Sequence, residues 1–443
     1  MSTRLDWISH PAGALRGELR VPGDKSISHR ALMLAALAEG RSCIEGFLEG
    51  EDTRATAAVL QQLGVRITAP ADGVRMIDGA GLRGLRASAQ PLDCGNAGTG
   101  MRLLAGLLAG QSFDSTLVGD ASLSRRPMRR VIDPLTAMGA RIDSSDGLPP
   151  LHIHGGRNLR GATIDTPVAS AQVKSSILLA GLYAEGTTEV REPQPTRDYT
   201  ERMLAAFGWP ITFGPGWARL EGGHRLRAAD VRVPGDFSSA AFFIVAACVT
   251  PGSDLVLREV GLNPRRTGLL DTLRAMGADI AIERLGEQGG EPVGDLRVRH
   301  APLRGIEIPV VHVADMIDEC PVLFVAAASA QGRTVLRGAA ELRVKESDRI
   351  AVMAAGLRRL GIAVEERPDG AAIEGGALRG GEVDSAGDHR CAMSFAVAGL
   401  VADAPVHIRD CANVATSFPG FLDTARAAGM AVTAAPATDE AAA

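Results

Sequence analysis

The sequence contains little cysteine, and its cysteines are scattered. The chain has six, none of them in a CxxC pair: Cys43, Cys94, Cys248, Cys320, Cys391 and Cys411. Zinc sites and disulfide frameworks are built from closely spaced cysteines. The pattern indicates neither, and it predicts buried, reduced thiols and no metal site.

Long apolar runs and a large net charge are also missing. Runs such as residues 240–249 are too short to span a bilayer, which takes about 20 apolar residues. The first residues, MSTRLDWISHPAG, show no basic stretch followed by an apolar one, so we expect a cytoplasmic protein. A net charge of −5 argues against broad contact with nucleic acid or a membrane. We therefore expect small-molecule partners.

Length and composition favour a globular protein with two domains. The chain has 443 residues, of which 46% are hydrophobic and 22% charged. Such a length exceeds the usual size of one core. The end of the chain is low in complexity and has nothing large to bury, so residues 434–443 are predicted to be a disordered tail.

A sixfold repeat marks the ends of amphipathic helices. The pattern LxxLGxxI, or a weaker form of it, contains one glycine per repeat: Gly64, Gly139, Gly208, Gly277, Gly361 and Gly429. Each glycine is expected to end a helix in the left-handed conformation, and a short strand should follow. The repeats are too long for a simple solenoid. They predict a duplicated α/β unit of the βαβαββ type.

Apolar helices alternate with this series. They are predicted at residues 31–40, 101–110, 177–186, 240–252, 322–332 and 395–405. Because they are apolar all round, they should be buried. The segments before them are polar, and buried helix starts that converge can bind anions through unpaired amide groups.

The longest-range echo divides the chain into two halves of three repeats. RVPGDKS begins at Arg20 and RVPGDFSS begins at Arg232. We expect one domain at residues 21–232 and another at residues 1–20 plus 233–443, with hinges near Val21 and Val233. Two crossings favour hinged closure.

Cationic segments stand at several of these helix starts. Residues 22–30 combine Lys25, Ser26 and Arg30, a set that suits phosphate and carboxylate groups. Residues 95–100, GNAGTG, resemble a phosphate-cradling loop, but no GxxxxGK[ST] motif occurs. In the arginine cluster of residues 124–130, Arg126 is expected to point inward because Pro127 fixes the chain direction. His29 is expected to pack or hydrogen-bond rather than act as a base.

Further polar groups lie in three later segments. The first segment could bind a polyol through Ser170 and Gln172, and Arg197 adds a cation nearby. Carboxylates follow in residues 316–320 and 342–349, beside cations and apolar residues that can tune them as proton carriers. Alternatives remain for each segment, namely a capped helix, a tight turn or a solvated charged face.

Taken together, the motifs resemble those of the 5-enolpyruvylshikimate-3-phosphate synthase family. In order, the chain contains PGDKSxSHR, GNAGTG, RPM, SAQVKS, RVKESDR and DHRxAMS. The resemblance covers nearly the whole chain. It implies an inside-out α/β barrel in each of two domains, and a monomer without cofactor that transfers the enolpyruvyl group of phosphoenolpyruvate to shikimate 3-phosphate.

The resemblance also implies the site residues. Those for shikimate 3-phosphate are Lys25, Ser26, Arg30, Ser170, Ala171, Gln172, Arg197, Asp318 and Lys345. Those for phosphoenolpyruvate are Lys25, Gly98, Arg126, Gln172, Glu346, Arg349 and Arg390. Asp318 is expected to take the proton of the attacking hydroxyl, and Glu346, with Lys25, to protonate the methylene carbon.

Two features leave open points. Thr416 stands where many relatives carry a lysine, so one phosphate contact is in doubt. Gly98 is the residue of glyphosate-sensitive members, whereas other motifs resemble the less sensitive branch. Two alternatives remain: the transferase that acts on UDP-N-acetylglucosamine, whose usual reactive cysteine is missing from residues 119–130, and a non-catalytic anion-binding repeat protein.

Overall fold

Each half of the sixfold repeat forms a compact unit of its own. The computed structural model describes residues 5–436. Unit 1 contains the chain up to Pro22, Gly235–Gly286 and the chain from Pro292 onward, and unit 2 contains Gly23–Pro234 and Glu287–Glu291.

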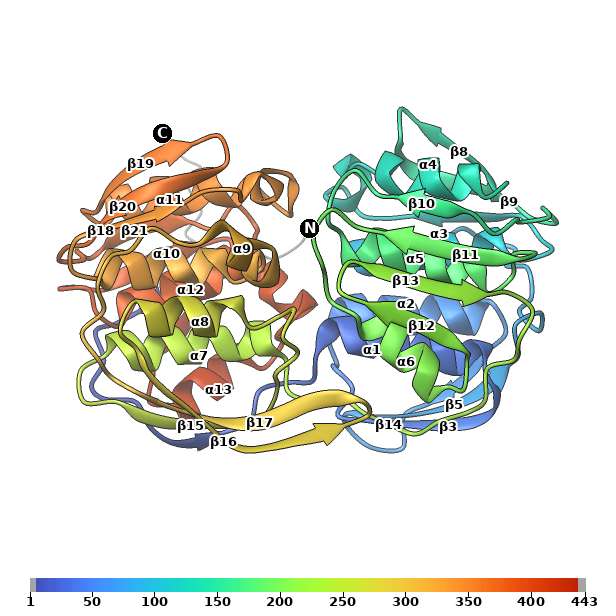
Figure 1. Cartoon of the computed structure of the whole chain (residues 1–443). Helices are drawn as coiled ribbons and strands as arrows, with labels where there is room; N and C mark the ends of the chain where they lie inside the picture. The colour runs from blue at the N-terminus through green and yellow to red at the C-terminus, as the bar shows by residue number, and fades with distance from the viewer. Residues whose placement is uncertain (1–4, 437–443) are drawn as a thin grey trace. The chain divides into compact units, whose positions relative to one another are not determined.

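Unit 2 repeats one order of elements three times (Figure 1). The first repeat contains α1 (Lys25–Leu37), β3 (Glu39–Glu45), α2 (Glu51–Gln62), β4 (Arg66–Thr68) and β5 (Val74–Ala80). The second contains β6 (Leu92–Asp93), α3 (Gly98–Ala109), β7 (Ser115–Val118), α4 (Arg129–Ala137), β8 (Arg141–Ser145) and β9 (Leu148–His154). The third contains β10 (Thr163–Asp165), α5 (Ala171–Gly181), β11 (Thr187–Arg191), α6 (Tyr199–Ala206), β12 (Ile211–Gly214) and β13 (Trp217–Glu221).

Unit 1 follows the same order. Its first repeat contains β2 (Arg16–Leu19), α7 (Phe237–Val249), β15 (Asp254–Gly261), α8 (Gly268–Ala275), β16 (Asp279–Gln288) and β17 (Glu291–Arg299). The second contains α9 (Val310–Val313), α10 (Cys320–Ser329), β18 (Arg333–Leu336), α11 (Arg349–Arg359), β19 (Ala363–Arg367) and β20 (Gly370–Glu374). The third contains β21 (Gly381–Asp384), α12 (His389–Gly399), β22 (Val406–Arg409), α13 (Phe421–Ala427) and β23 (Val432–Pro436).

The strands confirm the predicted α/β class. They form six sheets within residues 5–436, each of three or four strands, and none of these sheets closes on itself. Five of the sheets contain one parallel pair, such as β6 with β7, beside antiparallel pairs, such as β7 with β9 and β9 with β8. The sheet of β18, β20 and β19 is antiparallel throughout. In the repeats of α3, α5 and α12, the buried helix connects the two parallel strands.

Each unit is completed by strands from distant parts of the chain. In unit 2, β14 (Val231–Arg232) pairs in parallel with β3. In unit 1, β1 (Leu5–Ser9) is inserted between β22 and β23, and β2 pairs with β15. The residues before Val21 thus add two strands to unit 1.

The prediction that residues 434–443 form a disordered tail is wrong for residues 434–436. Residues 434–436 belong to β23, where Trp7 is paired with Ala434 and Asp6 with Ala435. The residues of a strand are held through their backbone groups, so small side chains do not prevent the pairing. Residues 437–443 lie outside the described residues.

The left-handed glycines predicted at the helix ends are all present. The φ angles of Gly64, Gly139 and Gly208 are 90°, 100° and 79°, and those of Gly277, Gly361 and Gly429 are 99°, 85° and 93°. Residues without a Cβ adopt this conformation at no steric cost. Every one of these glycines is followed by the expected strand.

The apolar helices are buried as predicted, but they begin earlier. The helix expected from residue 31 begins at Lys25, and the helix expected from residue 395 begins at His389. Polar residues before the apolar runs therefore form the first helical turns. Side chains of Asp24, Ser170 and Asp388 accept hydrogen bonds from amide groups at these starts.

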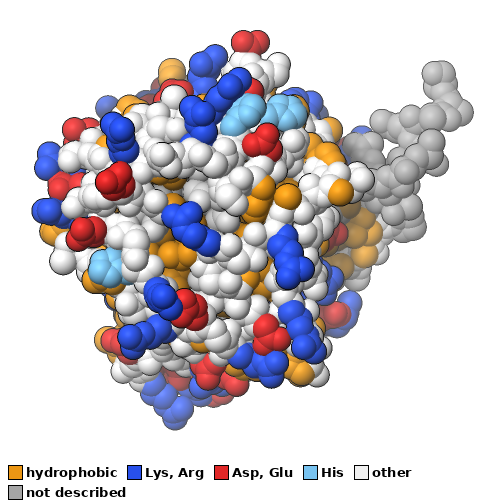
Figure 2. Space-filling model, turned by 90° about the vertical axis from the view of Figure 1, so that its right-hand side faces the viewer, with side chains coloured by type: hydrophobic (Ala, Val, Ile, Leu, Met, Phe, Trp, Pro, Cys, Tyr) orange, Lys and Arg blue, Asp and Glu red, His pale blue; other side chains and the backbone are white. Residues whose placement is uncertain are grey.

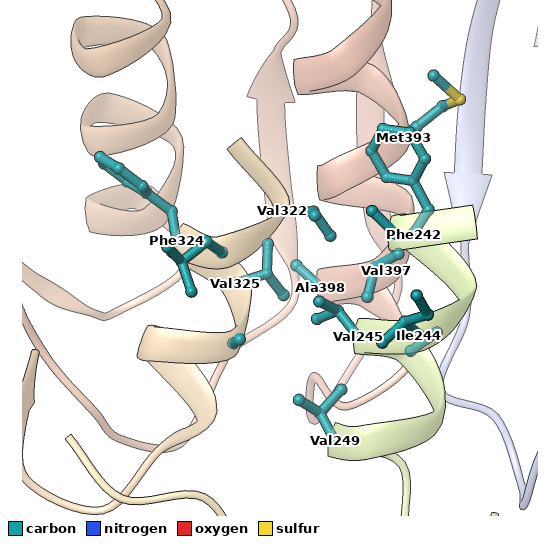
Figure 3. Close-up of a cluster of buried hydrophobic side chains, with 14 of the residues drawn as sticks. Phe242, Ile244, Val245, Val249, Val322, Phe324, Val325, Met393, Val397 and Ala398 are labelled. Atoms are coloured by element: carbon teal, nitrogen blue, oxygen red, sulfur yellow. The ribbon is translucent and has the colours of Figure 1, made fainter. Parts of the chain in front are cut away.

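Three buried helices form the centre of unit 1. Figure 3 shows side chains of α7, α10 and α12 that converge, among them Val245, Val322, Val325, Val397 and Ala398. In unit 2, α3 packs against α1 and α5. Strands β11 and β13 cover one side of α5 (Figure 1). The helix starts, with their polar residues, are thereby fixed by two dense cores.

On the face of unit 2 shown in Figure 2, basic and acidic side chains are interspersed. Five cysteines are buried and Cys43 is half-buried, and all six are free thiols. Cys43 is thus an exception to the predicted burial, because it lies on β3 at a position that is only partly covered. None of the helices within residues 5–436 has the length and apolarity needed to cross a membrane.

Candidate active site

The first buried helix of unit 2 begins with an ion pair that the sequence did not predict. Nζ of Lys25, at the start of α1, contacts Oδ2 of Asp52 on α2, and the side chains are 18% and 6% exposed. His29 lies about one turn further along α1, and its Nδ1 is 2.9 Å from the hydroxyl of Thr56. Burial, with help from Lys25, holds the pKa of His29 well below its ordinary value. The histidine is buried and contacts a hydroxyl, as predicted.

Gly98 lies at the start of α3 against two guanidinium groups. A Cβ atom on this glycine would lie 2.9 Å from Nη1 of Arg126 and 3.2 Å from Nη1 of Arg102. Arg102 donates to Oε1 of Gln172 at 2.8 Å, and Nε2 of Gln172 donates to Thr99 at 2.9 Å. This corner therefore brings two cations and an amide to one glycine, as an anion site requires.

The prediction that Arg126 points inward is confirmed. Its side chain is buried, whereas Arg125 and Arg129 are exposed and Arg130 is half-buried. Nη2 of Arg126 donates to Oδ1 of Asn96 at 2.6 Å. The arginine cluster thus contributes one of its four members to the corner at Gly98.

Arg30 lies deeper than expected for a ligand contact. Its Nε donates to Thr200 at 2.7 Å, Nη1 to the carbonyl of Ser26 at 2.9 Å, and Nη2 to Ser175 at 2.7 Å. Burial lowers the pKa of Arg30 to about 10, and the neighbouring Arg197 adds to the shift. A bound anion would favour the charged form of this arginine.

Three more of the residues predicted in unit 2 lie at the start of α5. The hydroxyl of Ser170 accepts from the amide of Val173 at 3.4 Å and caps the helix. Ala171 is its first residue and Gln172 its second. Unit 2 therefore brings together the starts of α1, α3 and α5 with the side chains named above.

In unit 1 one buried guanidinium contacts two carboxylates predicted to be catalytic. Nη2 of Arg349 donates to Oε2 of Glu346 at 2.6 Å, and Nη1 lies 3.7 Å from Oδ1 of Asp318. The side chain of Arg349 is 1% exposed, against 22% for Glu346 and 13% for Asp318. The arginine thus fixes two carboxylates that remain partly accessible.

A third carboxylate, that of Asp388, also binds this arginine. Nε of Arg349 donates to Oδ2 of Asp388 at 2.8 Å, and Asp388 also caps α12. Burial alone would lower the pKa of Arg349, but Asp388 and Glu346 outweigh it and raise the pKa. Burial alone would raise the pKa of Asp388, but Arg349 outweighs it and the pKa is lowered. Both groups are charged.

Further cations surround Asp318. Nζ of Lys345 lies 3.7 Å from its Oδ1, and Nη1 of Arg390 donates to its backbone carbonyl at 3.1 Å. Nη1 of Arg266 donates to Oδ2 at 3.1 Å. Lys345 and Arg390 were predicted as site residues, but Arg266 was not.

Arg266 supplies a cation to the second copy of the repeated motif. The echo GDFSS contains no cation itself, whereas GDKS contains Lys25. In the structure Arg266, from the loop before α8, contacts Ser238 of that echo and lies 3.6 Å from Asp236. Arg266 lies 28 residues after Ser238 in the chain, so the cation comes from a different segment.

Some functional signals were missed because the partners are distant in sequence. Asp52 is the second residue of α2, and Arg266 lies in NPRR just before α8, so both stand at helix starts, as Lys25 does. Acidic or basic residues at helix starts could have drawn attention to them. Thr416 turns its hydroxyl to the carbonyl of Asn413 at 2.7 Å.

Within residues 5–436 no group of three or more His, Cys, Asp or Glu side chains has the arrangement of a metal site. The polar clusters of both units instead combine carboxylates with arginine or lysine. Such clusters are suited to proton transfer and to anions rather than to a cation.

Comparison with solved structures identifies the class of fold. EPSP synthase from Acinetobacter baumannii aligns with a TM-score of 0.88 at 49% identity, over 97% of this chain and 100% of that chain. The enolpyruvyl transferase NikO from Streptomyces tendae aligns with a TM-score of 0.80 at 20% identity, over 98% of this chain and 100% of that chain. The fold is that of the enolpyruvyl transferases.

Sequence comparison identifies the family. The profile of EPSP synthase (3-phosphoshikimate 1-carboxyvinyltransferase) matches residues 10–425. The 3-phosphoshikimate 1-carboxyvinyltransferase of Xanthomonas campestris pv. campestris strain B100 is 66% identical over 431 residues, 97% of this chain and 98% of that protein. That of Xanthomonas axonopodis pv. citri strain 306 is 65% identical over 430 residues. The chain belongs to the EPSP synthase family, which confirms the resemblance.

Proposed function

We propose that the protein transfers the enolpyruvyl group of phosphoenolpyruvate to the 5-hydroxyl of shikimate 3-phosphate and releases phosphate. The reaction belongs to the shikimate pathway, which leads to chorismate and the aromatic amino acids. The family match supports this reaction over transfer to UDP-N-acetylglucosamine. The observation that supports this reaction most directly is that the buried Arg349 contacts both Asp318 and Glu346.

Two positioned carboxylates suit the two proton transfers of this reaction. Asp318 accepts the proton of the 5-hydroxyl as its oxygen attacks the carbon that bears the phosphate oxygen. Glu346, with Lys25, delivers a proton to the methylene carbon, and a tetrahedral adduct forms. The carbon–oxygen bond to phosphate then breaks, phosphate leaves with the electron pair, and the methyl group returns a proton to Glu346. General acid and base groups of this kind typically contribute about 100-fold or more.

The cations suit two substrates that repel each other. Shikimate 3-phosphate and phosphoenolpyruvate both carry several negative charges, and their approach is costly unless fixed cations compensate. We assign shikimate 3-phosphate to Lys25, Ser26, Arg30, Ser170, Ala171, Gln172, Arg197, Asp318 and Lys345. We assign phosphoenolpyruvate to Lys25, Gly98, Arg126, Gln172, Glu346, Arg349 and Arg390. In this assignment Arg30 acts mainly by holding Ser26, because its nitrogens bond to the protein.

The two units are proposed to be the domains that close on the substrates, with hinges near Val21 and Val233. We further propose that each is an inside-out α/β barrel, in the sense that three buried helices form the centre and three sheets the outside. The support is the packing of α7, α10 and α12 on one another. A monomer in the cytoplasm without a cofactor completes the proposal.

Phosphate release tests the function. The purified protein is incubated with phosphoenolpyruvate alone, with shikimate 3-phosphate alone, and with both. We expect phosphate only from the mixture, together with the enolpyruvyl product by mass spectrometry. Binding of one substrate without turnover of the mixture would favour the anion-binding alternative. Turnover with UDP-N-acetylglucosamine instead of shikimate 3-phosphate would overturn the acceptor.

A further inference from the structure

A buried cluster of three charges lies behind the start of α5 in unit 2. Nζ of Lys174, on α5, is 2.8 Å from Oε2 of Glu192 and 2.9 Å from Oε1 of Glu201. The side chains of Lys174, Glu192 and Glu201 are 3%, 0% and 2% exposed. Glu192 follows β11, and Glu201 lies in the first turn of α6. The cluster therefore joins three segments of the chain.

Burying three charges together destabilises the folded state unless their contacts compensate for the lost hydration. Burial removes the hydration of three charges, and their attraction only partly offsets this cost. Burial would lower the pKa of Lys174, but Glu201 and Glu192 outweigh it and raise the pKa. The lysine is therefore charged, and at least one carboxylate must be charged with it. Buried polar networks of this kind rigidify the groups that they connect.

Only one of the two carboxylates reaches the segments that carry proposed substrate contacts. Oε1 of Glu192 accepts from the backbone amide of Ser170 at 3.2 Å and from the hydroxyl of Thr196 at 2.7 Å. Ser170 caps α5, and Thr196 precedes Arg197 in the chain. Lys174 supports the same loop by donating to the carbonyl of Thr196 at 3.4 Å.

We infer that Glu192 is a positioning residue for the acceptor substrate, shikimate 3-phosphate. It holds the cap of α5 and the loop of Arg197 at a fixed separation, so that the hydroxyl, amide and guanidinium groups meet the phosphate of the substrate together. The inference rests on the proposed function and deepens it. Supporting residues that fix a binding group within a fraction of an ångström determine affinity without touching the ligand.

Glu201 offers a matched control. It is as buried as Glu192 and binds the same ammonium group, but its side-chain contacts are with Lys174 and do not include Ser170 or Thr196. Replacing either glutamate by methionine removes one carboxyl group and leaves Lys174 in contact with the other, so the loss of a partner for the ammonium group is matched. The two variants differ in whether the acceptor loops are released.

The experiment compares Glu192→Met, Glu192→Gln and Glu201→Met with the parent. Binding of shikimate 3-phosphate is measured by calorimetry, and kcat and the KM of each substrate by phosphate release. We expect Glu192→Met to weaken shikimate 3-phosphate roughly tenfold, the effect of losing about two hydrogen bonds. The KM of phosphoenolpyruvate and kcat at saturation should stay within about twofold. Glu192→Gln keeps an acceptor oxygen and should restore most of the affinity.

Two outcomes would overturn the inference. One is equal weakening of shikimate 3-phosphate by Glu192→Met and Glu201→Met, which would indicate a general effect of charge or stability. The other is no weakening by Glu192→Met. If that variant does not fold, Thr196→Val removes one hydroxyl contact while leaving all three charges, and it should weaken the same substrate about threefold. Unchanged affinity in Thr196→Val would then count against the inference.

The parent protein separates this inference from the proposed function. A parent that binds shikimate 3-phosphate and turns over the mixture upholds the function whatever the variants do. A parent without turnover overturns the function, and the positioning role with it. Unchanged binding in the variants of an active parent overturns the positioning role alone.

Discussion

At the scale of single residues, unit 1 holds its acidic groups in two different ways. The side chain of Asp388 is fully buried, and its oxygens accept hydrogen bonds from Arg349 and from amide groups at the start of α12. Asp318 and Glu346 bind the same guanidinium but keep part of their side chains exposed. A proton carrier must be both oriented and accessible. This difference separates the structural carboxylate from the two that we propose to be catalytic.

The first prediction concerns those two groups. Asp318→Asn and Glu346→Gln preserve shape while removing the titrating group, so each should lower kcat by roughly 100-fold or more and alter substrate affinity much less. Steady-state phosphate release provides both constants. As a control, Asp403→Asn changes a carboxylate that accepts from the amide of Gly380, and it should leave kcat near the parental value. Near-parental turnover in both site variants would show that the roles are wrongly assigned.

The second prediction concerns Gly98. An added Cβ atom would lie 2.9 Å from Nη1 of Arg126, closer than ordinary contact, so Gly98→Ala should displace that guanidinium. Glyphosate, an inhibitor of the family, is longer than phosphoenolpyruvate and should be obstructed first. An overpacking cost of about 1–3 kcal/mol corresponds to a rise of roughly 5- to 150-fold in its inhibition constant.

The measurement compares the inhibition constant of glyphosate with the KM of phosphoenolpyruvate in the same preparation. Gly13→Ala is the control, because a Cβ atom there would meet nothing within 4 Å. Equal shifts of the two constants, or none, would place Gly98 away from the donor.

At the scale of elements, the buried helices depend on close backbone approach. Gly106 of α3 faces α5, and a Cβ atom on it would lie 2.0 Å from the carbonyl oxygen of Ser176. That distance is far below any real contact, so the two helices could not keep their spacing. Small residues at such crossings set how near two helices can lie.

The third prediction follows for this crossing. Gly106→Ala should lower the free energy of unfolding by about 1–3 kcal/mol, because the core must shift to admit one methyl group. Urea unfolding followed by circular dichroism measures the change. Gly286→Ala, where a Cβ atom would meet nothing within 4 Å, should cause no loss. Equal stability of the two variants would contradict the packing described for α3 and α5.

The fourth prediction concerns the start of α12. Asp388→Asn keeps an oxygen to cap the helix. It removes the charge that binds Arg349, so unit 1 should lose about 1.5–3 kcal/mol near neutral pH. The pKa of Asp388 is lowered in the folded state, with burial outweighed by Arg349. Its stabilising effect is therefore present above the ordinary pKa of 3.8 and disappears as the pH falls through the folded value.

Urea unfolding at several pH values tests the fourth prediction. The difference between parent and Asp388→Asn should be constant near neutrality and shrink below pH 3.8. Asp254→Asn is the control, since Asp254 pairs with Arg297 at an exposed position and should contribute much less. A difference that does not change with pH would contradict the charged state of Asp388.

At the scale of the whole molecule, the chain passes from one unit to the other more than once. Residues up to Pro22 belong to unit 1, Gly23–Pro234 form most of unit 2, and the chain then returns to unit 1. The short segment Glu287–Glu291, at the turn of β16 and β17, groups again with unit 2. Because several chain segments connect the units, we expect hinged motion rather than free rotation.

The fifth prediction is ordered closure. Shikimate 3-phosphate at saturation should reduce the radius of gyration and increase the affinity for phosphoenolpyruvate, because proposed contacts come from both units. Small-angle scattering with and without the substrate measures the first effect, and calorimetry the second. Phosphate at the same concentration serves as the control. An identical radius in all states would contradict closure.

Local sequence patterns account for the repeat and for much of the secondary structure. Gly64 and its five equivalents had to end helices because only glycine takes the left-handed conformation without strain, and all six do so. Apolar runs such as residues 240–249 could only be buried. These features are local, so a short window of residues carries the information. The motif set also identified the family, since six motifs in order rarely occur by chance.

Tertiary structure alone decided which distant groups meet. Arg266 completes the cluster at Asp318, and Asp52 binds Lys25, although no local pattern joins either pair. The polar residues before the apolar runs became first helical turns because buried caps and ion pairs stabilise them there. Residues 434–436 joined a sheet because β1 offered an edge. Each outcome depends on contacts between residues far apart in the chain, which only the folded backbone brings within a few ångströms.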